Sequence, residues 1–300
     1  MSHLQSSHLF SVNGLVVVLT GGGSGLGRTM ATALAVNGAS KVFILGRRED
    51  ALKETAAQHP GTIIPVPADV TSKASLEAAY ATISAQTDYV NVLIANSGIE
   101  GPAARMPPAN ADGSPPTLAQ IRDHLWAIPS EDFTKTLDVN VTGAYYTILA
   151  FLPLLEAANK RRPAPQKNVM SPPLAQVIIT SSIAGFSRKV PAGISYNMSK
   201  AAVNHLVKLL STFFSEYGIR VNGIAPGLYH SDMSSRNFAE GDKGVSDGSF
   251  SHDAIPITRG GSDEDIAGLT LFLASASGGY INGNIMLTDG GRLAVMPAAY

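Results

Sequence analysis

Cysteine is absent from the 300-residue sequence. This excludes a disulfide framework, thiolate zinc sites and a cysteine nucleophile. Charged residues are scarce as well, at 15% of the chain, and 22 basic against 23 acidic side chains leave a net charge of −1. Because nucleic-acid binding depends on an excess of basic residues, we expect no nucleic-acid partner. No cluster of His, Asp and Glu indicates a metal site, and no metal is predicted.

Long apolar runs are also missing. No segment reaches the roughly 20 consecutive apolar residues that a membrane-spanning helix needs. The first ten residues, Met1 to Phe10, contain no basic stretch followed by a long apolar one, so we expect no secretory signal. These absences predict a soluble cytoplasmic protein without a membrane partner.

Short apolar runs, by contrast, recur along the whole chain. Each is rich in β-branched residues or leucine and lacks polar alternation, which is typical of strands covered on both faces. Segments with helical patterns separate them, so the alternation predicts an α/β fold with a doubly wound parallel sheet of about seven strands and helices on both faces. The expected strands are residues 15–20, 41–45, 62–66, 90–95, 175–180, 220–225 and 284–288. The expected helices are residues 26–36, 49–58, 73–86, 130–158, 195–217 and 266–274.

Three irregular stretches interrupt this alternation. Residues 101–129 and 159–173 are rich in proline, and the sheet pattern resumes after each, so both are interpreted as surface excursions. Residues 228–256 are rich in Ser, Gly and Asp, and we interpret them as a substrate loop, since such folds bind substrates at the carboxyl ends of strands. No shift in composition marks a domain boundary. We therefore expect one domain over residues 1–300, with 1–12 as an N-terminal extension.

A glycine-rich turn joins the first expected strand to the first expected helix. Its sequence is Thr20-Gly-Gly-Gly-Ser-Gly-Leu-Gly27. Glycines allow a tight turn and close approach to a pyrophosphate, and a helix N-terminus presents unpaired N–H groups to it. This position therefore predicts a dinucleotide site of the Rossmann type. The residues expected to form it are Gly21, Ser24, Gly25, Leu26 and Gly27.

The end of the second expected strand indicates which dinucleotide binds. An acidic residue about 20 positions after the glycine turn would bind the ribose 2′-hydroxyl of NAD. This chain has Arg47 and Arg48 there. Guanidinium groups suit a 2′-phosphate, so NADP(H) is favoured over NAD(H). Two alternatives stay open: the arginines are simply solvated, or Glu49 binds the ribose hydroxyl and lets the protein accept NAD.

A phenol and an ammonium group lie four residues apart at Tyr196 and Lys200, on one face of an expected helix. Hydroxyl groups of Thr180, Ser181 and Ser182 end the fifth expected strand. Each pattern alone is also common in ordinary structure, as an exposed helix pair or a strand-ending turn.

Taken together and in this order, the motifs resemble the classical short-chain dehydrogenase/reductase family. The resemblance extends from about Asn13 to Gly291. It rests on the glycine turn, Asp69-Val70, Asn96-Ser-Gly98, Asn140, Ser182, Tyr196-x-x-x-Lys200, Pro226-Gly227 and Asp289-Gly-Gly291.

The resemblance implies a catalytic group of Asn140, Ser182, Tyr196 and Lys200. Tyr196 would be the general acid in reduction or the base in oxidation, and Ser182 would bind the substrate oxygen. Lys200 would hold the nicotinamide ribose and, with the oxidised nicotinamide, lower the Tyr196 pKa. Asn140 would support a proton-relay water near Lys200; as an alternative, it is a polar residue that kinks its helix.

The resemblance also implies further cofactor-binding positions. Asp69 and Val70 would contact the adenine, and Asn96 and Gly98 would lie beside its ribose. Pro226, Gly227 and Ser231 would flank the nicotinamide, with Ser231 standing where the family often has threonine. Tyr196 and Lys200 belong to this set as well.

These features predict an NADP(H)-dependent oxidoreductase that interconverts a ketone or aldehyde and an alcohol. Two other functions remain open: a non-redox nucleotide-binding scaffold or sensor, and a lyase or isomerase on the same fold. The expected partner is a small carbonyl or alcohol substrate. The expected helices 131–158 and 195–217 carry more apolar surface than one sheet face covers, which predicts a homodimer or homotetramer.

Overall fold

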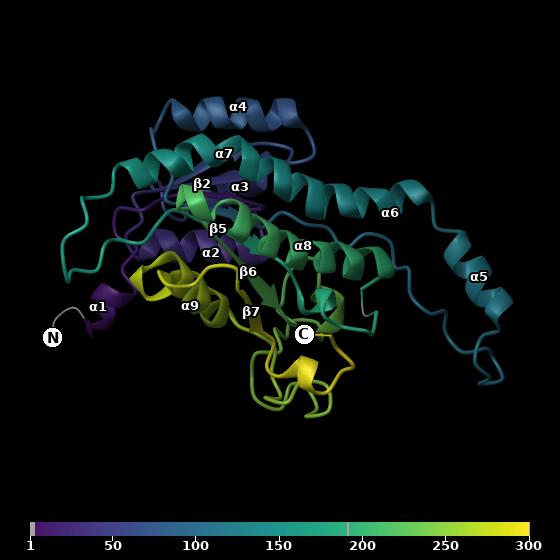
Figure 1. Cartoon of the computed structure of the whole chain (residues 1–300). Helices are drawn as coiled ribbons and strands as arrows, with labels where there is room; N and C mark the ends of the chain where they lie inside the picture. Colours follow the sequence, from purple (N-terminus) through teal and green to yellow (C-terminus); the bar gives the residue numbers. More distant parts are fainter. Residues whose placement is uncertain (1–3, 191, 300) are drawn as a thin grey trace.

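One seven-stranded sheet organises the chain in the computed structural model, which describes residues 4–190 and 192–299 (Figure 1). The strand order is β3-β2-β1-β4-β5-β6-β7, and every neighbouring pair is parallel. All seven expected strands are confirmed, with ends displaced by at most two residues. Their bounds are β1 (Val16–Thr20), β2 (Lys41–Gly46), β3 (Ile63–Pro67), β4 (Val92–Ala95), β5 (Gln176–Thr180), β6 (Arg220–Pro226) and β7 (Ile285–Thr288).

The uninterrupted apolar character of the strands follows from burial on both faces. In β1, Val16 and Val18 belong to one core, and Val17 and Leu19 belong to the other, because successive side chains point to opposite faces. The first core includes residues of α4, α7 and α8, and the second includes residues of α2, α3 and α9. Both helical layers are visible in Figure 1. Their bounds are α2 (Gly25–Val36), α3 (Glu49–Ala56), α4 (Lys73–Ser84), α7 (Gly143–Lys160), α8 (Ile194–Phe213) and α9 (Asp263–Ala274).

The long helix expected from residue 130 has an irregular turn inside it. Helix α6 (Ser130–Leu137) continues through a π-helical turn, Asp138–Thr142, into α7. The continuous helix Ser130–Lys160 is long and apolar enough, by length and composition, to cross a membrane. Such a helix is weak evidence of a membrane span, because a core helix of a soluble protein passes the same test. Here 44% of its most apolar window is buried inside the fold, and α7 packs on α4, β4 and β5.

The excursion at residues 101–129 contains a helix that the sequence interpretation did not include. Helix α5 (Leu118–Trp126) projects from the body of the molecule (Figure 1), and none of its residues is buried. Its N-terminus has a capping box, in which the Thr117 side chain accepts from the Gln120 backbone N–H and the Gln120 side chain accepts in return. This Thr-x-x-Gln spacing was the available sequence signal. A short helix, α1 (Ser6–Leu9), precedes the sheet.

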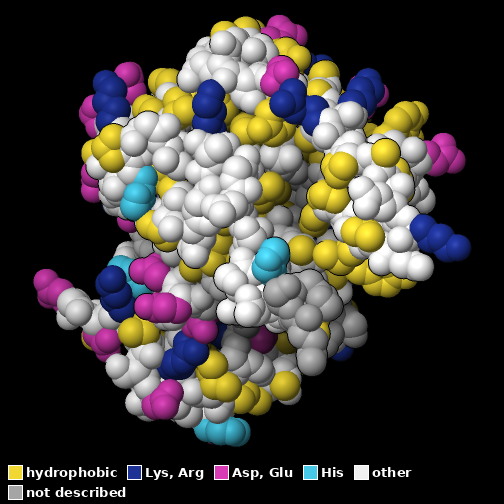
Figure 2. Space-filling model, turned by 90° about the vertical axis from the view of Figure 1, so that its left-hand side faces the viewer, with side chains coloured by type: hydrophobic (Ala, Val, Ile, Leu, Met, Phe, Trp, Pro, Cys, Tyr) yellow, Lys and Arg dark blue, Asp and Glu magenta, His cyan; other side chains and the backbone are white. Residues whose placement is uncertain are grey.

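The strand order places a crevice where the direction of winding reverses, between β1 and β4. The loops after β1, β2, β4, β5 and β6 all leave this carboxyl edge of the sheet, so it is the place where distant motifs can meet. On the face seen in Figure 2, acidic and basic side chains are interspersed.

Candidate active site

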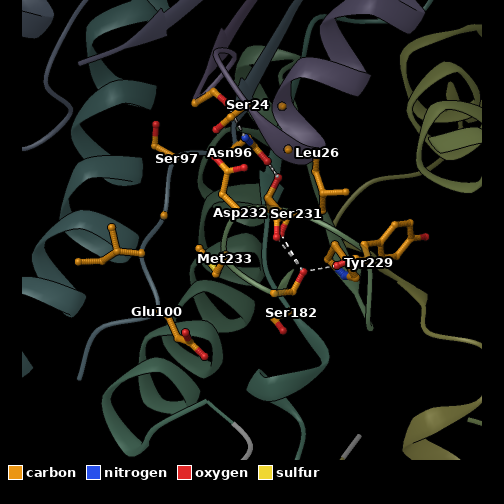
Figure 3. A pocket seen from close by; sticks show the side chains of 18 of the residues that line it. Ser24, Leu26, Asn96, Ser97, Glu100, Ser182, Tyr229, Ser231, Asp232 and Met233 are labelled. Carbon is orange, nitrogen blue, oxygen red and sulfur yellow. Dashed lines mark hydrogen bonds between the residues drawn. The ribbon is translucent and has the colours of Figure 1, made fainter. Parts of the chain in front are cut away.

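A cavity of about 700 Å³ opens at the carboxyl edge of the sheet. Every residue expected in the site lines it, with the exception of Asn140. Figure 3 shows that Ser24, Leu26 and Asn96 lie towards one end, and Ser182 and Glu100 lie towards the other. The structure thus brings the glycine turn and the Ser–Tyr–Lys residues to one cavity, although about 170 residues separate them in sequence.

The glycine turn leaves the N-terminus of α2 open to a ligand. Ser24 occupies the N-cap position, but its side chain makes no capping hydrogen bond, and the first turn of α2 contains no acidic residue. The N–H groups of this first turn have no carbonyl partner within the helix. An anion in the cavity would satisfy them and would be favoured by the helix dipole.

Three glycines beside the cavity allow chain segments to approach more closely than a side chain would permit. A Cβ on Gly27 would lie 2.1 Å from the carbonyl oxygen of Gly21, and one on Gly21 would lie 2.9 Å from the Asn96 amide nitrogen. Gly21 also has a φ of +72°, which side chains rarely adopt. A Cβ on Gly98 would lie 3.1 Å from Asn140 Oδ1 and 3.5 Å from Lys200 Nζ. These glycines let the turn, which together with the N-terminus of α2 we call the cradle, pack closely against the segment after β4.

Both arginines after β2 line the cavity. Arg48 donates to Ser24 Oγ at 2.8 Å and lies 3.5 Å from the Asp232 carboxylate, in an exposed ion pair. Arg47 is close enough to Asp69 for its charge to help lower the pKa of that carboxyl group. Glu49 does not line the cavity and pairs with Lys53 at 2.9 Å.

Asp69 is held by its own turn. Its Oδ1 accepts from the Thr71 N–H at 2.9 Å and from the Thr71 hydroxyl at 2.7 Å. The hydrogen bond from the Thr71 backbone is the main cause that lowers the Asp69 pKa. Asp69 is thus ionised and fixed at the cavity wall beside Val70, whose methyl groups approach Gly143 of α7.

Asn96 connects the ends of two strands. Its Nδ2 donates to the Thr20 carbonyl at 3.1 Å, and its Oδ1 accepts from the Thr180 hydroxyl at 3.0 Å. The Asn96 side chain, which was expected beside the adenine ribose, therefore also links the ends of β1 and β5 by hydrogen bonds at the edge of the cavity.

The expected catalytic residues come from two elements. Ser182 follows β5, and its hydroxyl accepts from the Ala184 N–H at 3.1 Å, while the buried Ser181 hydroxyl donates to Asn204 in α8. Of the two serines, Ser182 is the one expected to act. On α8, Lys200 is 4% exposed, and its Nζ lies 5.7 Å from the centre of the Tyr196 ring and donates to the Thr180 carbonyl at 2.8 Å.

Burial dominates the acid–base properties of this pair. Burial raises the pKa of Tyr196 to about 12. A hydrogen bond with Ser182 lowers this pKa in part, and the negative charge of Glu100 raises it further. Burial lowers the pKa of Lys200 to about 8, because an ammonium group loses hydration there. In the chain without a cofactor, desolvation of the phenolate therefore outweighs any attraction from Lys200. A lowering of the Tyr196 pKa by Lys200 together with the oxidised nicotinamide stays a prediction.

Asn140 lies behind the cavity, on the π-helical turn. Its Oδ1 accepts from the Ile99 N–H at 2.8 Å, and its Nδ2 donates to the Ile99 carbonyl and to Ser199 Oγ, both at 2.9 Å. The side chain clamps the segment after β4 against α8. Its geometry is that of a positioning residue, and π-turns of this kind are frequent at functional sites.

The substrate loop covers one side of the cavity. Ser231 lies against Gly25 of the glycine turn, with 3.3 Å between the Ser231 Cβ and the position of a Gly25 Cβ. Met233 also lines the cavity. His230, Phe238 and Phe250 instead stack edge-to-face on one another and give the loop a small core of its own.

Sequence reasoning missed four charged residues of the cavity wall. They are Glu100, Asp232, Arg236 and Arg292. Glu100 forms an ion pair with Arg236 that links the segment after β4 to the substrate loop. A partial signal existed for two of them, because Glu100 follows Asn96-Ser-Gly98 by two positions and Arg292 directly follows Asp289-Gly-Gly291.

Comparisons with known proteins agree with this geometry. The family model described as enoyl-(acyl carrier protein) reductase matches residues 21–292. A short-chain dehydrogenase/reductase of Diaporthe leptostromiformis, PhomF, is 42% identical over 301 residues, which cover 99% of this chain and 97% of the relative.

Two solved structures have the same fold. The Pseudomonas aeruginosa RhlG/NADP active-site complex superposes with a TM-score of 0.74 at 29% identity, over 94% of this chain and 98% of its own. The 3-ketoacyl-(acyl-carrier-protein) reductase of Brucella melitensis, complexed with NADH, gives 0.72 at 26% identity, over 94% and 99%. The fold, the cavity and these matches define a nicotinamide-dependent oxidoreductase of the Rossmann type. The chain belongs to the short-chain dehydrogenase/reductase family.

Proposed function

We propose that this oxidoreductase interconverts a ketone or aldehyde and the corresponding alcohol, with NADP(H) as its cofactor. The observation that carries the proposal is the presence of Ser182, Tyr196 and Lys200 in the same cavity as the open N-terminus of α2. A reduced nicotinamide, when bound, supplies the hydride for the carbonyl carbon. The chain's own residues then have to hold the carbonyl oxygen and give it a proton.

Tyr196 is the proposed proton donor. Its hydroxyl shares the cavity with Ser182, whose hydroxyl would orient the substrate oxygen. Because burial keeps the phenol protonated, the chain is set to donate a proton during reduction. Lys200, largely protonated at neutral pH, would hold ribose hydroxyls and favour the phenolate that reduction leaves behind.

The preference for NADP(H) rests on Arg47 and Arg48. Both arginines line the cavity and would supply the positive charge for a 2′-phosphate, whereas Glu49 is paired with Lys53. Arg47→Asp is therefore expected to shift the ratio of kcat/KM values from NADPH towards NADH. Lys53→Asp makes the same change of charge outside the cavity and should leave the ratio unchanged. An unaltered ratio in Arg47→Asp would contradict the phosphate assignment.

A panel of ketones with NADPH and NADH tests the reaction itself. We expect oxidation of the reduced cofactor, followed by its near-ultraviolet absorbance, with at least one carbonyl. Tight NADPH binding without turnover of any carbonyl or alcohol would instead support a nucleotide-binding scaffold or sensor. Product formation without net change in the cofactor would support a lyase or isomerase.

The outer face of α8 supports a homodimer or homotetramer. Ile194, Met198, Leu209 and Phe213 repeat at helical spacing and are between 36% and 72% exposed. Phe213→Glu should shift the mass measured by light scattering towards the monomer, and a monomeric wild type at micromolar concentration would refute the proposal. We further propose a cytoplasmic protein with no nucleic-acid or membrane partner, because its long apolar helix packs on the sheet.

A further inference from the structure

Arg292 stands at the boundary of two cavities. It lines the cavity that holds Tyr196, and it also lines a second one of about 380 Å³. Besides Arg292, the second cavity is lined by Ala254, by the apolar side chains of Val190, Val295 and Met296, and by the charged side chains of Lys189 and Asp253. A substrate that reaches Tyr196 and extends past Arg292 would therefore meet both apolar and charged side chains.

Arg292 has no ion pair and no hydrogen bond from its guanidinium within the described residues, although it is more than half buried. The nearest acid is Asp289, whose charge favours the protonated guanidinium while burial opposes it and lowers the Arg292 pKa. The Asp289 carboxylate is already engaged, because it accepts from the N–H groups of Gly291 at 3.0 Å and Leu293 at 2.8 Å. Arg292 is thus a cation that lacks a bound counter-charge.

The other charged groups near Tyr196 are balanced. Glu100 is paired with Arg236, and the second cavity has one cation, Lys189, and one anion, Asp253. Lys200 donates to a carbonyl at the cofactor side. The uncompensated positive charge on the substrate side therefore belongs to Arg292.

The position of Arg292 is fixed by the tail of the chain. It begins a short 3₁₀ helix, Arg292–Ala294, in which Leu293 is buried. The following residues pair with the segment after β5: the Arg188 N–H donates to the Pro297 carbonyl, and the Ala299 N–H donates to the Phe186 carbonyl, both at 2.8 Å. The backbone that carries Arg292 is therefore ordered before a ligand binds, so that binding has to order only the side chain.

We propose that Arg292 binds a carboxylate of the substrate, so that the chain acts on an aliphatic oxo acid whose ketone lies at Tyr196. This inference rests on the proposed function and names the substrate class of the same site. A carboxylate fits better than a phosphate, since Asp253 offsets the charge of Lys189 in the second cavity and leaves one net positive charge, that of Arg292. The apolar walls would contact the methylene chain.

The test compares levulinate and its homologues, lengthened by one and two methylenes between the ketone and the carboxylate, each with its methyl ester. The wild type should reduce at least one acid with a higher kcat/KM than its ester. Arg292→Gln should lower kcat/KM for that acid by about 10–100-fold and leave the ester unchanged, because a charged hydrogen bond is lost. Arg292→Lys should recover part of the loss.

The control is Arg188→Gln, which removes a cation from the segment that pairs with the tail of the chain and lines neither cavity. Arg188→Gln should leave kcat/KM unchanged for both the acid and its ester. Equal kcat/KM values for acid and ester in the wild type would overturn the inference. So would an equal loss of kcat/KM for both substrates in Arg292→Gln, which is the result expected if Arg292 has a purely structural role.

A binding measurement separates this inference from the proposed function. Hexanoate, which has no carbonyl to reduce, should raise the Tm of the wild type in the presence of NADP and fail to do so in Arg292→Gln. If neutral ketones are reduced but hexanoate has no effect on Tm, the inference fails and the proposed function stands. If hexanoate binds through Arg292 and no carbonyl is reduced, the carboxylate site stands and the proposed function fails.

Discussion

Removal of the Asn140 side chain tests whether the clamp behind the cavity holds the cofactor site together. Asn140→Ala deletes three hydrogen bonds of 2.8–2.9 Å, two with the Ile99 backbone and one with Ser199. The Ile99 N–H and carbonyl then lose their partners, whereas Ser199 Oγ keeps its donation to the Tyr196 carbonyl. At about 1–3 kcal/mol for each of these two groups left unpaired, we expect a loss of about 2–6 kcal/mol in the free energy of unfolding.

The loss should also reach the cofactor, because Ile99 connects Gly98 and Glu100, which both line the cavity. Urea unfolding should show a lower midpoint with an unchanged slope, and fluorescence titration should show weaker NADPH binding. A wild-type midpoint in Asn140→Ala would refute the reasoning.

Asn159→Ala is the matched control. Asn159 also makes three hydrogen bonds: its Oδ1 accepts from the Ala175 N–H, and its Nδ2 donates to the carbonyls of Tyr217 and Gly218. These contacts lie at the amino ends of β5 and β6, away from the cavity. We therefore expect a comparable loss of stability with no change in NADPH affinity. If both variants weakened NADPH binding equally, the effect would be one of general stability and not of the clamp.

Three further predictions concern the same cavity. Gly27→Ala places a Cβ 2.1 Å from a backbone oxygen and should abolish NADPH binding in titration; retained affinity would contradict the cradle. Glu100→Gln removes a negative charge that raises the pKa of Tyr196, so the pH profile of alcohol oxidation should move to lower pH. Arg236→Gln removes the positive charge paired with Glu100 and should move the profile to higher pH. Shifts in the same direction would instead indicate a structural effect of the broken ion pair. Burial lowers the pKa of Lys200 from 10.5 to about 8, so between these pH values the unfolded chain binds one proton more and the free energy of unfolding rises with pH. Urea unfolding of Lys200→Met should lack this rise of about 3 kcal/mol. An unchanged pH dependence in the variant would contradict the burial of a charged lysine.

The strands and most helices could be predicted from sequence because local signals and tertiary burial agree. Helix α4 begins at the expected residue 73, where the Ser72 side chain caps it. Helix α9 begins at Asp263, three residues before the expected start, because the Ser262 capping box adds a turn ahead of the apolar pattern. Helix α5 was not expected, because the proline-rich composition around it hid its capping box. The π-helical turn at Asn140 carries no periodicity signal, since it interrupts a helix that reads as continuous.

The lining residues of the cavity could be predicted where they belong to a motif on one element. They could not be predicted where two distant loops meet. The glycine turn and Tyr196-x-x-x-Lys200 each lie on one element, so their spacing in sequence determines their spacing in the fold. The ion pair of Glu100 with Arg236 joins positions 136 residues apart, and loop conformation alone decides that they meet. Charge balance in the cavity, and with it the unpaired state of Arg292, emerges only after such pairs are known.

The most direct test of the account measures NADPH binding and single-turnover ketone reduction in the wild type and in Tyr196→Phe. This variant keeps the ring and removes only the hydroxyl that we propose as the proton donor. We predict unchanged NADPH affinity and a rate of reduction lower by about 10²–10⁴-fold. A near-normal rate in Tyr196→Phe, or a wild type that does not bind NADPH, would contradict the central claim.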